Sequence, residues 1–210
     1  MVKTSLVSFM EFLDVPPRKS IDVIKRHRDE RRRRSKGAPP YYWPFLAAIR
    51  RAVSSLHTLP EIAAVVDKQS DLAKRGNYAE VYQGFQSWWS RVEACGVPVA
   101  RGTTWCHGEL IVPIRGDRES GMGVFAVEYR DGTIEVILPY FKQEKPEDVD
   151  LVLRIMEHTM GDLVAEASPM VLDARRSREF RLSARRDRGE LDVILESGAE
   201  MYVRAWQNAA

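Results

Sequence analysis

The chain has 210 residues, of which 44% are hydrophobic and 30% are charged. This length is enough for one hydrophobic core, and this composition is typical of folded proteins and excludes a disordered chain. No stretch approaches the roughly 18–20 consecutive apolar residues that cross a bilayer, and the N-terminus lacks the pattern of a secretory signal. With only Cys95 and Cys106, the sequence excludes a disulfide framework. We therefore expect a cytoplasmic protein without a membrane partner.

The charges are unevenly distributed along the chain, although the net charge is only +2. Residues 1–56 contain 13 Lys and Arg against 5 Asp and Glu, whereas the remaining residues contain 19 against 25. Such an asymmetry indicates that the basic part has an anionic partner.

Apolar residues at helical spacing predict helices throughout the first half of the chain. A first helix at 4–13 ends before Pro16-Pro17, and Ser20 can cap a second helix. This second helix continues into the basic stretch 25–36, which offers almost nothing to bury.

A break at 37–40 separates the basic stretch from a helix at 41–56, which carries Pro44 in its first turn. Another helix is predicted at 59–66. The strongest helical pattern runs from 78 to about 94, with Asn77 as its N-cap.

Beyond Gly102 the apolar residues take the spacing of β-strands. Asp131-Gly132 predicts a hairpin, and a helix is expected from Pro146 to about Met160. The predicted strands are 109–114, 124–129, 133–141, 170–172, 179–184, 190–196 and 200–206.

This order of elements predicts an α+β fold, in which an N-terminal helical half is followed by an antiparallel β-meander, one helix and a second β-meander. We expect a basic helical arm at 1–40 and a single α+β domain at 41–210. Within that domain, 41–95 would be helical and 100–207 rich in sheet. The change of pattern near residue 100 leaves open whether the two halves are one domain or two.

The basic arm is the first candidate site. Residues 18–36 contain 10 Lys and Arg against 3 Asp and Glu, a pattern typical of surfaces that bind a phosphate backbone. The aromatic residues that follow could stack on unpaired bases. The candidate binding residues are Arg26, Arg28, Arg31, Arg32, Arg33, Arg34, Lys36, Tyr41, Tyr42 and Trp43. The simpler interpretation is a solvated helix face followed by aromatic residues of the core.

A second candidate site consists of His107 and Glu109. Both are expected on one strand and therefore on one face, where the carboxylate could orient the imidazole for acid–base chemistry. Arg101 and Arg115 would then stabilise an anion. An ordinary surface ion pair is the simpler interpretation of the same residues.

A metal site and the common nucleotide sites are not predicted. Cys95, Cys106 and His107 are too few and too unevenly spaced for a zinc site, which usually has four ligands. The chain has neither a phosphate-binding loop nor a dinucleotide-binding loop. Glu135-Val136-Ile137 lacks the lysine that metal-assisted nuclease chemistry would need. A second basic concentration, at 175–188, is interpreted as charged residues of an edge strand.

Three functional hypotheses follow. The leading one is a non-enzymatic binding protein whose basic helix contacts nucleic acid or an acidic protein surface. The second is an RNase-like enzyme that cleaves phosphodiesters with His107 and Glu109, and the third is a pure protein–protein adaptor. No cofactor is expected, and self-association is left open.

Overall fold

The computed structural model describes residues 1–34, 41–54, 59–100, 102–115, 123–142 and 149–209. The helices in these ranges are α1 (Leu6–Leu13), α2 (Ser20–Arg34), α3 (Trp43–Ser54), α4 (Leu59–Asp67), α5 (Leu72–Trp89), α6 (Val149–Thr159) and α7 (Arg188–Asn208). The strands are β1 (Val2–Lys3), β2 (Ala94–Val97), β3 (Gly102–His107), β4 (Leu110–Arg115), β5 (Phe125–Tyr129), β6 (Ile134–Tyr140), β7 (Ser168–Asp173) and β8 (Arg178–Phe180). Two short 3-10 turns, η1 (Pro17–Lys19) and η2 (Met160–Asp162), complete the described elements.

The larger sheet has five strands in the order β2-β5-β6-β7-β8. Its neighbours are antiparallel except β6 and β7, which are parallel because α6 crosses over between them. The β5–β6 hairpin turns at Gly132, whose φ of +83° favours glycine. The smaller sheet, β1-β4-β3, joins the first residues of the chain to the β3–β4 hairpin.

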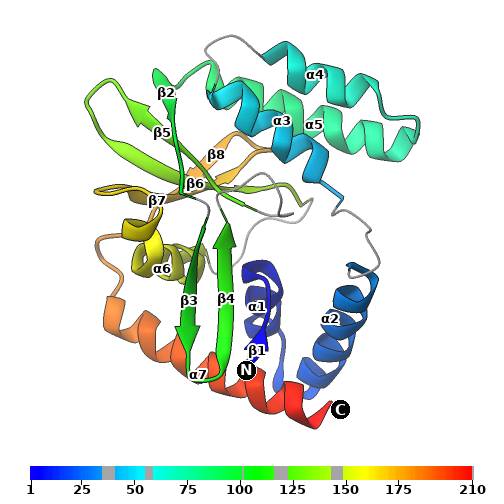
Figure 1. Cartoon of the computed structure of the whole chain (residues 1–210), viewed down its shortest axis with the longest axis vertical. Coiled ribbons are helices and arrows are strands. Elements are labelled where there is room, and N and C mark those ends of the chain that lie inside the picture. Colours follow the sequence, from blue (N-terminus) through cyan, green and yellow to red (C-terminus); the bar gives the residue numbers. More distant parts are fainter. Residues whose placement is uncertain (35–40, 55–58, 101, 116–122, 143–148, 210) are drawn as a thin grey trace.

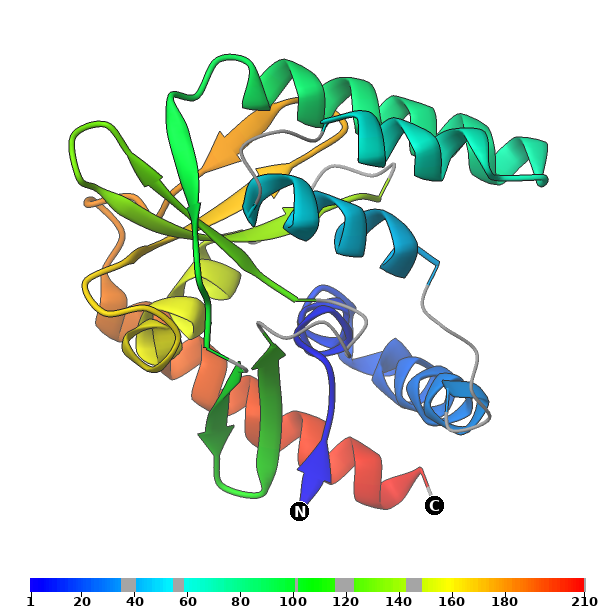
Figure 2. The same cartoon turned by 45° about the horizontal axis from the view of Figure 1, so that its top comes forward.

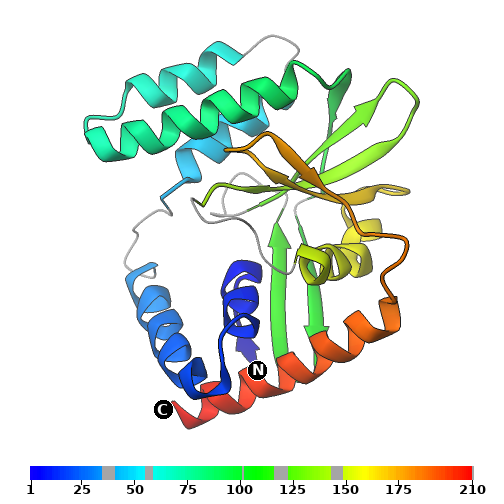
Figure 3. The same cartoon turned by 180° about the vertical axis from the view of Figure 1, so that it is seen from behind.

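Helices cover both faces of the five-stranded sheet (Figures 1 and 2). Helices α3, α4 and α5 lie on one face, whereas α6 lies on the other. Beyond α6, the long helix α7 runs along the far side of the molecule, where it meets the β3–β4 hairpin, α1 and α2 (Figure 3). The N- and C-terminal ends of the chain both lie at this side.

Successive residues of β5 point into two different hydrophobic cores. Phe125 and Val127 pack with α3, α4 and α5, whereas Ala126, and Val124 just before the strand, pack with α1, α2, α6 and α7. The alternation follows from the two-residue period of a strand. Both faces of this strand are buried, which explains its almost uninterrupted apolar sequence.

The basic N-terminal stretch contributes to the second core. Phe9 and Phe12 of α1 and Ile24 of α2 are almost completely buried there, together with Tyr202 of α7. The arm predicted at 1–40 therefore has an apolar side packed on the rest of the protein. Its boundary stays a prediction, because residues 35–40 lie outside the described residues.

The predicted α+β class and the order of N-terminal helices before strands are confirmed. The β5–β6 hairpin at Asp131-Gly132 is also confirmed, as is Pro44 in the first turn of α3. Ser5 caps α1 by accepting a hydrogen bond from the backbone N–H of Ser8.

The strands predicted at 190–196 and 200–206 are wrong, since these residues form α7. The alternation of apolar residues in 190–196 coexists with a longer helical pattern, in which Leu191, Leu195, Ala199 and Tyr202 fall on one buried side. Asp187 caps this helix by accepting hydrogen bonds from the first backbone N–H groups.

Three further expectations need correction. Helix α5 begins at Leu72 with Asp71 as its N-cap, so that Asn77 lies inside the helix and not at its end. Residues 94–97 form β2 and not the end of a helix. The predicted first meander is divided, because β4 pairs with β3 and β1 in the smaller sheet whereas β5 and β6 belong to the larger one.

Candidate nucleic-acid interface

Helix α2 is fixed to the body of the protein along one side. Val23 and Ile24 enter the second core, and His27 is 5% exposed. One nitrogen of His27, Nε2, lies 3.0 Å from Oε2 of Glu11, and the other, Nδ1, lies 3.2 Å from the hydroxyl of Tyr202. The Tyr202 hydroxyl also lies 2.8 Å from Oγ1 of Thr4. These buried polar contacts fix the rotation of α2 about its axis.

The same contacts shift the pKa values of two groups. Burial raises the pKa of Glu11, but the hydrogen bond from His27 and the charge of Arg26 outweigh burial and lower it overall. Burial also raises the pKa of Tyr202 to about 12. At neutral pH Glu11 is therefore a carboxylate and Tyr202 a neutral hydroxyl, as their hydrogen bonds require.

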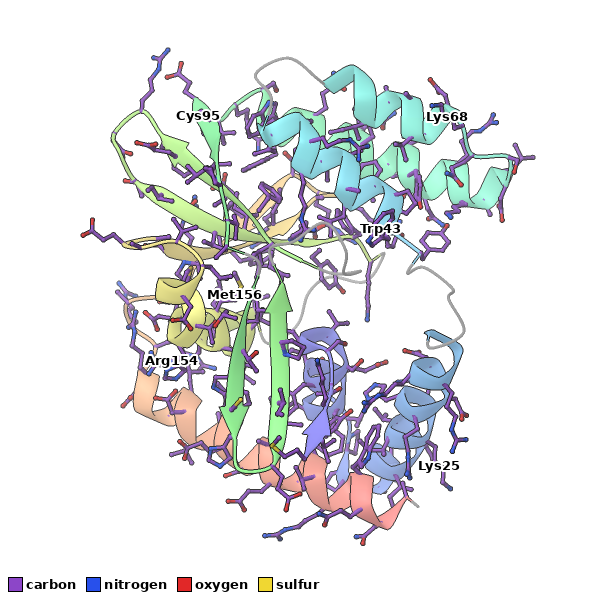
Figure 4. The ribbon with its side chains drawn as sticks, in the orientation of Figure 1. Lys25, Trp43, Lys68, Cys95, Arg154 and Met156 are labelled. Carbon is purple, nitrogen blue, oxygen red and sulfur yellow. The ribbon has the colours of Figure 1, made fainter. Side chains whose placement is uncertain are left out.

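The opposite side of α2, together with η1, is rich in exposed positive charge. Among the described side chains of η1 and α2, six exposed cations stand against the two exposed carboxylates of Asp22 and Asp29. The six cations are Arg18, Lys19, Lys25, Arg26, Arg31 and Arg32. Lys25 lies on the outer side of α2 (Figure 4). We call these six side chains the α2 basic surface.

Some of these cations already have partners. Arg26 donates to Glu11 at 2.5 Å, Arg31 donates to the backbone oxygen of Lys3 at 3.3 Å, and Arg32 lies 3.7 Å from Asp29. In the last pair both side chains are exposed. Exposed ion pairs contribute little to stability and readily exchange their partners. Lys25 and Arg32 are both exposed, so that an anion can approach their charges. Arg33, Arg34 and Lys36 have side chains outside the described residues.

Arg28 has a different environment from the other arginines. Its guanidinium lies over the ring of Trp206, 5.1 Å from the centroid. Trp206 in turn stacks on Tyr202, which stacks on His27. This column of rings links α2 to α7. The sequence reasoning missed Trp206 because 200–206 was expected to be a strand, although the four-residue spacing of Tyr202 and Trp206 is typical of a helix.

Comparisons with protein-family models, with curated proteins and with solved structures give no match.

The aromatic residues predicted to stack on bases lie against other elements. Tyr41 is 44% exposed, and its ring lies 4.7 Å from that of Tyr42 and 5.2 Å from Nζ of Lys74. Tyr42 is half-buried, and its hydroxyl accepts a hydrogen bond from Arg175. Trp43 begins α3 and is also half-buried. Of the three, Tyr41 has the most accessible ring.

The structure does not place His107 and Glu109 on one strand face. His107 is the last residue of β3, whereas Glu109 lies in the turn before β4, where Gly108 has a φ of +53°. His107 stacks on Trp105, and Glu109 lies 3.8 Å from the N-terminal ammonium of Met1. In the described ranges, no hydrogen bond joins the two side chains. Arg101 and the side chain of Arg115 lie outside those ranges.

The second basic concentration is largely neutralised by carboxylates. The observed pairs are Arg175 with Glu80, Arg176 with Asp173, Arg181 with Glu135 and Glu179, Arg186 with Asp150, and Arg188 with Glu157. Such pairing distinguishes this segment from the α2 basic surface. It favours a structural role for these arginines over binding of an anionic partner.

Two kinds of feature are absent from the described residues, a cluster of metal ligands and a helix that could cross a membrane. In the described ranges, no three His, Cys, Asp or Glu side chains come together as ligands for a metal ion. Across those ranges, no helix combines the length and the apolar character that crossing a bilayer demands.

A charge network between α6 and α7 predicts a contribution to stability that depends on pH. Hydrogen bonds from Arg154 and His158 lower the pKa of Asp192 from 3.8 to about 2. Because the folded pKa is the lower one, this stabilisation is complete above about pH 4 and is lost as the pH falls towards 2. We expect a loss of at most about 2 kcal/mol over this interval.

Urea unfolding between pH 5 and pH 2 would measure this loss by comparing the protein with its Asp192→Asn variant, in which the group cannot titrate. The variant should show a shallower decrease. Equal decreases in both proteins would contradict the assignment to Asp192.

Proposed function

We propose that this protein binds nucleic acid through the α2 basic surface. The observation that carries the proposal is the excess of exposed cations on a helix whose other side is fixed by buried contacts. A rigid helix presents its charges without the entropic cost of ordering them on binding. The phosphate backbone offers closely spaced negative charges with which several such cations can interact at once.

The spacing of the cations supports an extended anion as the ligand. Lys25 and Arg32 lie seven residues apart on α2, which is almost two helical turns, and Arg18 lies in η1, just before this helix. Lys25 and Arg32 therefore lie on one side of α2, about 10 Å apart along its axis. Two cations at this separation suit a polymer of phosphates better than a single small anion. Contacts of this kind carry no information about base sequence, so the proposed binding tolerates many sequences.

Binding should weaken steeply with salt. If about four phosphates are neutralised, raising the salt from about 50 mM to about 200 mM should reduce the affinity on the order of a hundredfold. Fluorescence anisotropy with labelled single- and double-stranded DNA and RNA measures this directly. Comparing the four probes also shows which nucleic acid the surface prefers.

Replacing Lys25 and Arg32 together by glutamine should reduce the affinity for the preferred probe by about tenfold or more, because two phosphate contacts are lost. The matched control replaces Lys68 and Arg185 by glutamine, since both are exposed in turns away from α2, the first after α4 and the second before α7. Both double variants lower the net charge by the same amount. The control should lose less than about threefold, as expected for a long-range charge effect alone.

Equal losses in the two double variants would overturn the proposal, because binding would then depend on overall charge and not on α2. Absence of binding to any probe at low salt would overturn it as well. Tighter binding to polyglutamate than to any nucleic acid would instead indicate an acidic protein partner.

A further inference from the structure

Helix α7 carries apolar side chains on a side that faces away from the core. Seven large hydrophobic side chains are exposed in the described residues, and three of them belong to this one helix. Val193 is 62% exposed, Ile194 40% and Met201 46%. Isolated exposed apolar residues are common, but a group of them on one helix typically marks a contact surface.

These residues border a groove between α7 and the end of α1. The groove has a volume of about 300 Å³ and an almost entirely apolar lining. Val193, Ile194 and Met201 line one wall, and Phe12, Leu13, Val15 and Pro17 contribute to the other. Gly198 brings the two walls together, since a Cβ atom at this position would overlap the side chain of Leu13.

The exposed stripe of α7 has an order of side chains that complements itself. Glu190, Ile194, Ser197, Met201 and Arg204 follow at intervals of four, three, four and three residues, which is the spacing of one helical face in a coiled coil. An acidic residue begins the stripe and a basic residue ends it. An apolar residue lies on each side of the small central Ser197.

We propose that this stripe is the interface of a homodimer in which two copies of α7 pack antiparallel. A two-fold axis near Ser197 would place Glu190 opposite Arg204 of the partner subunit. The same axis would place Ile194 opposite Met201 of the partner subunit, and the small side chain of Ser197 would allow the two helices to approach closely. One surface thus supplies both halves of the contact, as a two-fold interface requires.

The charges favour a second copy of this chain over another partner. Arg204 is 74% exposed, and its intramolecular contact with Glu200, at 3.5 Å, is also exposed. Within the described residues, no hydrogen bond or ion pair engages the carboxylate of Glu190. Two equivalent ion pairs would form in the dimer, one at each end of the apolar stripe. The inference does not depend on the proposed function.

Sedimentation velocity over a series of concentrations tests the proposal. The unmodified chain should shift from monomer to dimer as its concentration rises. Ile194→Glu should weaken the dimer at least about a hundredfold, because two unpaired carboxylates would be buried in each interface. Leu72→Glu is the matched control, since Leu72 is 77% exposed on a different helix, and it should leave the dimer unchanged.

Charge exchange tests the antiparallel arrangement separately from the apolar contact. Glu190→Arg alone and Arg204→Glu alone should each weaken the dimer roughly five- to tenfold, because like charges would then meet twice per dimer. Combining the two substitutions should restore the original association. Circular dichroism of each variant checks that α7 remains folded.

A chain that stays monomeric at every concentration would overturn the proposal, even if an unrelated protein bound the groove. A dimer insensitive to Ile194→Glu would overturn it too. Failure of the double exchange to restore association would overturn the antiparallel arrangement.

Discussion

Replacing Arg181 by alanine should lower the free energy of unfolding by about 3 kcal/mol, because it leaves a buried carboxylate without its counterion. Glu135 lies on β6 and is 3% exposed. Arg181 reaches it with two donors, Nε at 2.5 Å from Oε1 and the terminal nitrogen at 2.8 Å from Oε2. The hydroxyl of Tyr129 donates the remaining hydrogen bond at 2.6 Å.

Tyr129 shares the buried environment of Glu135. Burial, followed by the hydrogen bond to Glu135, raises the pKa of Tyr129 well above its usual value. Arg181 itself is 47% exposed, so the expected cost lies at the lower end of the range for broken buried pairs.

Urea unfolding at neutral pH measures the effect of Arg181→Ala. The control combines Arg181→Ala with Glu135→Gln, which removes the buried charge and should recover part of the lost stability. A loss of less than about 1 kcal/mol in the single variant would contradict this explanation. It would show that water stabilises the carboxylate of Glu135 as effectively as Arg181 does.

Replacing Gly84 by alanine should be the second most damaging change, with a loss of about 3 kcal/mol or incomplete folding. Gly84 lies in the middle of α5, where the helix crosses the turn after β7. A methyl group there would overlap the backbone oxygens of Ala174 and Arg175. Backbone atoms cannot rotate away as a flexible side chain can, so the helix or the turn would have to move.

Gly76→Ala provides a control on the same helix. A Cβ atom at Gly76 would meet nothing within 4 Å, and alanine has the higher helix propensity. This substitution should therefore raise the free energy of unfolding by about 0.5–1 kcal/mol. Thermal unfolding of the two variants gives opposite signs if packing at Gly84 is responsible. Similar behaviour of both variants would contradict this explanation.

Local patterns in the sequence predicted the parts of the fold that depend on neighbouring residues. The turn at Asp131-Gly132 and the helix with Pro44 in its first turn follow from short-range chemistry. Helix α7 was missed because an apolar run such as Val193-Ile194-Leu195 fits either a strand or a helix. The helical spacing of Leu191, Leu195 and Tyr202 decides for the helix, and this side of α7 is buried against α1, α2, α6 and the β3–β4 hairpin.

For the candidate site, the sequence located the basic helix but not its surroundings. The sequence alone places Arg26 and Arg28 on a helix. Their contacts with Glu11 and Trp206, in contrast, depend on tertiary packing. The pairing of the arginines at 175–188 with carboxylates was equally hidden. Their partners include Glu80, Glu135 and Asp150, which come from three separate elements.

The first residues of the chain have a consequence for folding during synthesis. Val2 and Thr4 donate backbone hydrogen bonds to Glu109 and Ile111, and the hydroxyl of Thr4 meets that of Tyr202. Phe9 and Phe12 are likewise buried against Tyr202. A ribosome must therefore add residues 188–208 before the apolar sides of α1 and α2 can be fully covered. Until α7 has emerged, α1 exposes its phenylalanines to chaperones and to other nascent chains.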